Sequence, residues 1–222
     1  MNFFQLFTKL TDLYEKFNGK QLTGSQIVKQ INRSIPFTEC RVIKQHSLSV
    51  SSNKFEVSGM YDPEVDEQNK PPITIELLMP HGKKSFYFDE SEVSFDHWHE
   101  MCVDIANVLG HEYVHLYQSR RRNFNECRPF ISKSTNLGFR ENQEYYGNSD
   151  EIDAYAFTAA CNLVYESVLF CKPVKVKKSL TYKIYKYYFG KTNPEIIDKF
   201  VKKTIIHRRR LERQYNETYN KK

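Results

Sequence analysis

Residues 111–115 read His-Glu-Tyr-Val-His, an HExxH pattern, and their types and spacing suit them to metal chemistry. A helix turns once every 3.6 residues, so the imidazoles of His111 and His115 are expected on one face, directed at a common point. Imidazole nitrogen is a preferred zinc ligand, and this spacing supplies two ligands to one tetrahedral ion. Glu112 is expected beside the metal, where it could take a proton from a metal-bound water without being a ligand itself.

The pattern is uncommon by chance in a chain of this composition. With 7 His and 18 Glu in 222 residues, roughly 0.02 random matches are expected. The alternative is a helix with two structural histidines, so the surrounding sequence has to favour one reading. Apolar residues at helical spacing surround the motif and indicate that the imidazoles face inward. They are Trp98, Met101, Cys102, Ile105, Val108, Leu109 and Leu116.

A third ligand must come from further along the chain. The extended pattern HExxHxxGxxH is excluded, because Gln118 and Arg121 stand where it requires Gly and His. His207 is the only later histidine, and it lies in a basic region. We therefore expect a carboxylate, and the candidates are Glu126, Glu141, Glu144, Asp150, Glu151, Asp153 and Glu166.

We favour Glu151, in the first turn of a helix predicted to begin near Asn148. Ala154 follows three residues later on the same face, and its small side chain would let this helix approach the HExxH helix closely. The alternative for Glu151 is a capping box with Asn148 as N-cap. Asp150 is the second choice of ligand, and Asp153 is expected to accept a hydrogen bond from an imidazole N–H and so orient it.

The segments HEYVHLYQ (111–118) and YYGNSDEIDAYA (145–156) resemble the zincin metallopeptidases whose third ligand is a glutamate. They are similar to small predicted peptidases encoded in bacteriophage genomes. The resemblance covers roughly residues 91–171, and the chain lacks the ExxxD form of the third-ligand region that thermolysin-like enzymes have.

The resemblance implies a Zn²⁺-dependent peptidase that hydrolyses a protein or peptide substrate. Its metal ligands would be His111, His115 and Glu151, and its general base would be Glu112. An edge strand, for which we expect residues 73–79, would pair with the extended substrate.

Further side chains could contribute to such a site. Tyr145, Tyr146 and Tyr155 lie near the predicted third ligand in sequence and are candidate donors to an oxyanion, although packing is the favoured explanation for each of them. His97 lies about 21 Å before His111 along the helix axis and cannot share its metal. We interpret His97, His99 and His81 as structural.

Hydrophobic periodicity predicts the elements that position these residues. Helical spacing covers 2–17 and 25–33, and a period of two then predicts an antiparallel sheet of three to five strands between Phe37 and Asp89. The polar run 62–70 is predicted to be a loop. Helices are predicted from Ser91 or Ser94 to about Arg121, then, after a loop through Gly147, over 148–170, 180–188 and 194–215.

This order predicts an α+β, zincin-like fold. N-terminal helices and a small antiparallel sheet would precede a long active-site helix and a C-terminal helical part. We expect one domain over residues 1–222, with 172–222 as a basic helical extension.

Charge is unevenly placed along the chain. Residues 172–222 contain 16 Lys and Arg against 4 Asp and Glu, so they carry +12, whereas the whole chain carries +6 and the remainder therefore −6. The basic region predicts an acidic partner, of which nucleic acid is one candidate. Amphipathic helices with aromatic cores and solvated faces are the alternative. The second functional reading is thus a nucleic-acid-associated or virion structural protein that keeps a zincin fold with little or no proteolysis.

The compartment is inferred from cysteines and hydropathy. Five widely spaced cysteines without a CxxC motif indicate a reducing environment. Neither a signal peptide nor an apolar run long enough to cross a bilayer is recognised. We expect no membrane partner and a cytoplasmic protein, in the host cytoplasm or the virion if the gene is carried by a phage.

Overall fold

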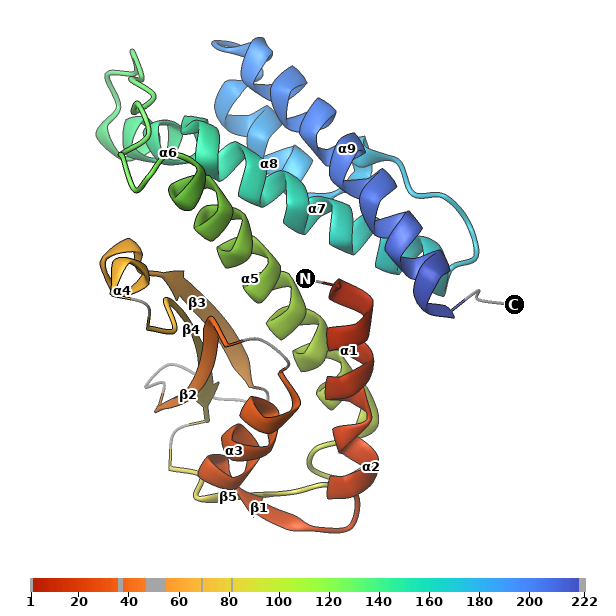
Figure 1. Cartoon of the computed structure of the whole chain (residues 1–222). Coiled ribbons are helices and arrows are strands. Elements are labelled where there is room, and N and C mark those ends of the chain that lie inside the picture. The colour runs from red at the N-terminus through yellow and green to blue at the C-terminus, as the bar shows by residue number, and fades with distance from the viewer. Residues whose placement is uncertain (1, 36–37, 47–54, 69, 81, 220–222) are drawn as a thin grey trace. The chain divides into compact units, whose positions relative to one another are not determined.

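The computed structural model describes residues 2–35, 38–46, 55–68, 70–80 and 82–219 (Figure 1). It has an α+β fold that divides into two compact units, Met1–Glu112 and Tyr113–Lys222. The boundary falls inside helix α5 (Phe95–Arg121). The two units share this helix, so the division does not decide whether residues 1–222 form a single domain. The single domain therefore stays a prediction.

Three helices open the first unit, α1 (Phe3–Thr11), α2 (Leu13–Phe17) and α3 (Gly24–Ser34). Residues 2–17 were predicted as one helical segment and form two helices, whereas α3 lies where it was predicted. The Asn2 side chain caps α1 by accepting hydrogen bonds from the amides of Phe4 and Gln5. A capping box of Thr23 and Gln26 starts α3. These caps satisfy backbone amides that have no partner within the helix, so the helix starts are set locally.

Two small sheets complete the first unit. One has the order β2 (Cys40–His46), β4 (Ile73–Met79), β3 (Glu56–Tyr61), and the other pairs β1 (Gln21–Thr23) with β5 (Ser85–Tyr87). Strands β1 and β5 are antiparallel, as are β3 and β4, but β2 and β4 are parallel. The prediction of one wholly antiparallel sheet is therefore wrong, because alternation identifies strands but not their partners.

Strand β4 shows the predicted alternation. Ile73, Ile75, Leu77 and Met79 are fully buried, and the residues between them are partly exposed. However, β4 is the central strand, hydrogen-bonded on both sides, so residues 73–79 cannot be the edge that accepts a substrate. In the described part of the chain, β3 pairs on one side only.

Two segments predicted to be loops contain helices. Helix α4 (Pro63–Glu67) lies within 62–70; Asp62 caps it through the amides of Glu64 and Val65. Helix α6 (Leu137–Gly147) lies before Asn148. Only Gln143 and Gly147 of α6 are buried, so the helix has no apolar stripe by which its sequence could be recognised.

Helix α5 is anchored in the first unit through Trp98, which is fully buried. Its indole Nε1 donates to the Leu10 carbonyl over 2.9 Å. Its ring makes edge contacts with Phe17 and Phe88, at centroid distances of 5.3 and 5.4 Å. These contacts fix the long helix that carries the HExxH motif, at the predicted position.

The second unit is helical and consists of α6, α7 (Ser149–Leu169), the 3₁₀ turn η1 (Val176–Lys178), α8 (Leu180–Phe189) and α9 (Pro194–Tyr219). Helices α7, α8 and α9 pack together around one core (Figure 1). Its buried members are Ile152, Ala156, Ala159, Tyr185, Phe189, Ile196 and Phe200. The described part of the basic region, residues 172–219, is thus largely helical, and aromatic residues of α8 and α9 contribute to this core. None of the described helices combines the length and hydropathy needed to cross a membrane.

Candidate metal centre

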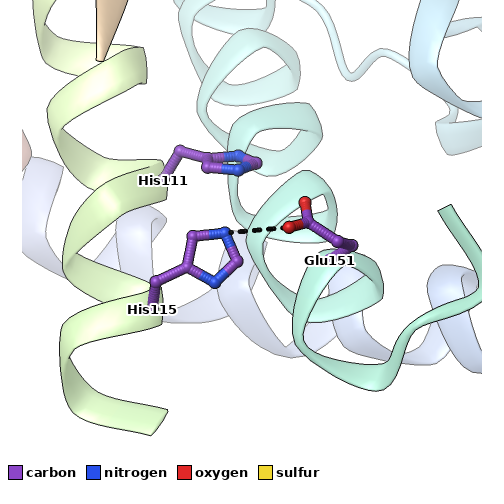
Figure 2. A group of neighbouring side chains, drawn as sticks. All are labelled: His111, His115 and Glu151. Atoms are coloured by element: carbon purple, nitrogen blue, oxygen red, sulfur yellow. Dashed lines mark ion pairs between the residues drawn. The ribbon is translucent and has the colours of Figure 1, made fainter. Parts of the chain in front are cut away.

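His111, His115 and Glu151 come together as a three-residue group with the composition of a metal site (Figure 2). One ligand atom from each lies within 4.8 Å of the other two, and all three side chains are half-buried. The His115 Nε2 and Glu151 Oε1 atoms are 3.5 Å apart. The two imidazoles share a helix face, as their spacing predicts.

The donor set fits a metal ion by its chemistry and its distances. Zinc accepts imidazole nitrogen and carboxylate oxygen at about 2.1 Å, which places two ligand atoms of a tetrahedral ion about 3.4 Å apart. The 3.5 Å between His115 Nε2 and Glu151 Oε1 is close to this ligand–ligand distance. It is longer than the typical N–H···O hydrogen bond of about 2.9 Å. These three side chains could therefore hold a metal ion.

The start of α7 is held by the last turns of α5. Arg122, directly after α5, makes two hydrogen bonds to the Asp150 carboxylate, at 2.9 and 2.6 Å. Gln118 donates to the backbone carbonyl of Asp150 over 3.3 Å. Asn148 caps α7 by accepting from the Asp150 amide. These contacts hold Asp150 in place and thereby position Glu151, the next residue, opposite His115.

The choice among the candidate carboxylates follows from their partners. Asp150 is occupied by Arg122, and Glu151 joins the histidines. Asp153 does orient an imidazole, but that of His207 on α9, to which it lies at 2.8 Å, with Lys203 at 2.9 Å. Asp153 therefore accepts a hydrogen bond from His207 and not from an imidazole of the HExxH motif, for which we had proposed it. Although burial opposes this, the hydrogen bonds from His207 and Lys203 lower the pKa of Asp153 to about 2.

Glu112 is buried, with 8% of its surface exposed. Gly59 on β3 lies against it: a Cβ atom at position 59 would come within 3.3 Å of Glu112 Cγ and 2.4 Å of Val108 Cγ1. Because a side chain at 59 would collide with α5, glycine allows the close approach of β3 to the helix. The predicted base thus lies beside β3, one of the two edge strands of the mixed sheet in the described residues.

Two tyrosines lie near Glu151, the predicted third ligand. The hydroxyl of Tyr145 on α6 is 3.4 Å from that of Tyr155 on α7. Burial, this hydrogen bond and the negative charge of Glu151 raise the pKa of Tyr145 above its ordinary value, and burial raises the pKa of Tyr155 to about 12. Both phenols therefore stay protonated at neutral pH and can donate. Tyr146, the third candidate, is stacked on Tyr188 at 5.5 Å.

The other histidines weighed from the sequence lie outside this group. His99 packs edge-on against Phe7 at a centroid distance of 5.0 Å, and burial lowers its pKa. His97 is on the first turn of α5, far along the helix from His111. His81 lies outside the described residues.

Comparison with models of protein families, with curated proteins and with solved structures finds no match for this chain. What can be said of its function therefore depends on the residues and their geometry.

Two residues that position the site, Arg122 and Gly59, were not predicted from the sequence. Arg122 continues the helical line of His111, His115 and Gln118, at intervals of four, three and four residues, so periodicity could have marked it as facing the site. Gly59 had no such signal, since a glycine within a strand also marks bulges and bends.

Proposed function

We propose that the chain is a zinc-dependent metallopeptidase, most simply an endopeptidase. The observation that carries the proposal is the convergence of His111, His115 and Glu151 on one point, with Glu112 next to the first ligand on the same helix. Two histidines, a carboxylate and an adjacent glutamate are the donor set and base of many zinc hydrolases.

The two ingredients of the reaction would come from different groups. Zinc, when bound, supplies a Lewis acid that polarises the scissile carbonyl and acidifies water. The Glu112 carboxylate accepts the proton of the attacking water and passes it to the leaving amine.

Strand β3 is the better candidate for holding an extended substrate. It pairs on one side only in the described part of the chain, and Gly59 brings it against Glu112. Main-chain hydrogen bonds to such an edge would align a peptide with little dependence on its side chains. A protein or unfolded peptide substrate fits this arrangement.

Metal content tests the site. We expect about one zinc per chain in the wild-type protein by elemental mass spectrometry, and loss of zinc in His111→Ala, His115→Ala and Glu151→Ala. Glu141→Gln is the matched control, because Glu141 is another candidate carboxylate but is exposed and lies outside the three-residue group. Equal zinc in the ligand variants, or loss of zinc in Glu141→Gln, would refute this ligand set.

Cleavage tests the reaction. Glu112→Gln keeps the size of the side chain but removes the base, so we expect casein cleavage to fall by about 10²–10⁴-fold while zinc is retained. If the wild-type protein binds zinc without cleaving casein or unfolded peptides, the peptidase proposal fails. The virion structural or nucleic-acid-associated reading would then be preferred.

A further inference from the structure

We propose that the second unit binds single-stranded nucleic acid at a cleft between α6 and α8. The cleft has a volume of about 400 Å³. Its aromatic lining consists of Phe139, Tyr187 and Tyr188, and its polar lining includes Ser134, Asn136 and Asn142. This site is independent of the metal group and of the proposed peptidase activity.

Tyr187 exposes most of its surface to solvent. It is 71% exposed, although its neighbours in the cleft hold it in place. Phe139 meets it edge-on at a centroid distance of 5.7 Å, and Tyr188 does so at 5.0 Å. An exposed tyrosine held by two rings at interplanar angles of 65° and 77° is a platform on which an unpaired base can stack.

The amide side chains of the cleft can read a base edge. Asn136 Oδ1 accepts from the Phe139 amide, and Asn142 Nδ2 donates to the Gly138 carbonyl. Within the described part of the chain, Asn136 Nδ2 and Asn142 Oδ1 have no such role. One donor and one acceptor beside a stacking ring match the alternating groups on the edges of nucleobases.

Hydrogen bonds of a buried glutamine hold the two walls of the cleft together. Gln143 on α6 is 2% exposed, and its amide nitrogen donates to the Tyr188 carbonyl on α8 over 2.6 Å. The same nitrogen lies 3.2 Å from the Thr192 hydroxyl. Because this buried amide ties the two helices together, the rings and amides of the cleft keep their mutual positions.

Charge favours a polyanion as the ligand. Residues 172–194 contain seven lysines and no Asp or Glu, and all seven lysines are exposed. In the described residues, no ion pair includes any of them. Lys183 stands one helical turn before Tyr187 on α8. A single strand could place its phosphates against the lysines and stack one of its unpaired bases on Tyr187.

A single strand fits better than a duplex or an acidic peptide. In a duplex the base faces are already stacked, so Tyr187 would have nothing to bind. An acidic peptide has charge but few planar groups. The exposed ring therefore distinguishes the three ligands, and it sets the design of the test.

Binding is measured with the full-length protein by fluorescence anisotropy, using a labelled thymidine strand of about 12 nucleotides, within known site sizes. We expect Tyr187→Ala to weaken binding about tenfold, the typical effect of losing one stacked base. Tyr187→Trp should retain binding. Lys183→Gln should lower the magnitude of the slope of log K against log salt by about 0.7, the value for one phosphate on a single strand.

Tyr87→Ala is the matched control, since Tyr87 is also exposed, at 40%, but lies on β5. Circular dichroism and zinc content should be unchanged in Tyr187→Ala. Binding that is insensitive to Tyr187→Ala, equal affinity for the duplex, or equally effective competition by polyglutamate would overturn the proposal. Each of these results would indicate plain electrostatic attachment.

Discussion

At the scale of single residues, the candidate metal centre depends on the groups that hold His111, His115 and Glu151 in place as much as on these three residues themselves. The HExxH spacing accounts for two imidazoles, but a third ligand on another helix must be oriented by its own surroundings. Tyr145 is the candidate for this role at Glu151: its phenol is protonated at neutral pH, contacts the Tyr155 hydroxyl, and lies near enough to Glu151 for the charge of that carboxylate to raise the phenol pKa. It is a positioning residue, in addition to its candidacy as an oxyanion donor.

Tyr145→Phe removes one hydroxyl and leaves the ring. We expect zinc affinity to fall about tenfold, the lower end of the effects seen when a group that orients a ligand is lost. Competition with a chromogenic chelator measures this. Tyr187→Phe is the control, because its hydroxyl lies on α8, away from Glu151. Unchanged affinity in Tyr145→Phe would mean that the phenol does not orient the ligand.

At the scale of elements, the contact between the end of α5 and the start of α7 sets the distance from His115 to Glu151. Arg122 donates hydrogen bonds to both carboxylate oxygens of Asp150. Such a bidentate pair fixes the relative orientation of the two side chains as well as the distance between them. The ligand is the next residue along the helix. A change in the Arg122–Asp150 contact would therefore move Glu151 relative to the two histidines of the candidate metal site.

Arg122→Lys keeps the charge but cannot form the paired bond. We expect zinc affinity to decrease about tenfold, with the helical content unchanged by circular dichroism. Arg121→Lys is the matched control, one residue earlier and exposed. If both variants bind zinc like the wild type, the Arg122–Asp150 pair is not what positions Glu151.

At the scale of the whole molecule, the basic region is part of the core of the second unit. Phe200 of α9 is fully buried and stacked on Tyr185 of α8 at 4.3 Å, and both pack on α7, which carries Glu151. Deleting residues 172–222 would therefore expose the apolar face of α7, so it cannot serve as a specific test of the basic charges. Single substitutions are required.

Phe200→Ala leaves a cavity in this core. We expect the free energy of unfolding to fall by about 3–5 kcal/mol. Added zinc should raise the midpoint of thermal unfolding of wild type and variant alike, because it binds only the native state. Ile206→Ala, at a site 59% exposed on the same helix, should change stability little. A Phe200→Ala protein as stable as the control would contradict this account of the core.

What the sequence determined by itself is local. The two imidazoles on one face of α5, the alternation of β4 and the helix starts at Asn2, Thr23 and Asn148 follow from backbone geometry within a few residues. Near Glu151 the sequence narrowed the third ligand to a short acidic stretch, and Ala154 favoured the residue that the structure brings to the histidines.

Only the tertiary structure decided which distant groups meet. It placed Arg122 on Asp150 and left Glu151 to the histidines, turned Asp153 toward α9, made β4 central instead of an edge, and formed α6 from a segment without an apolar stripe. The physical reason is that such meetings depend on many weak contacts summed over the chain, and no local pattern records that sum.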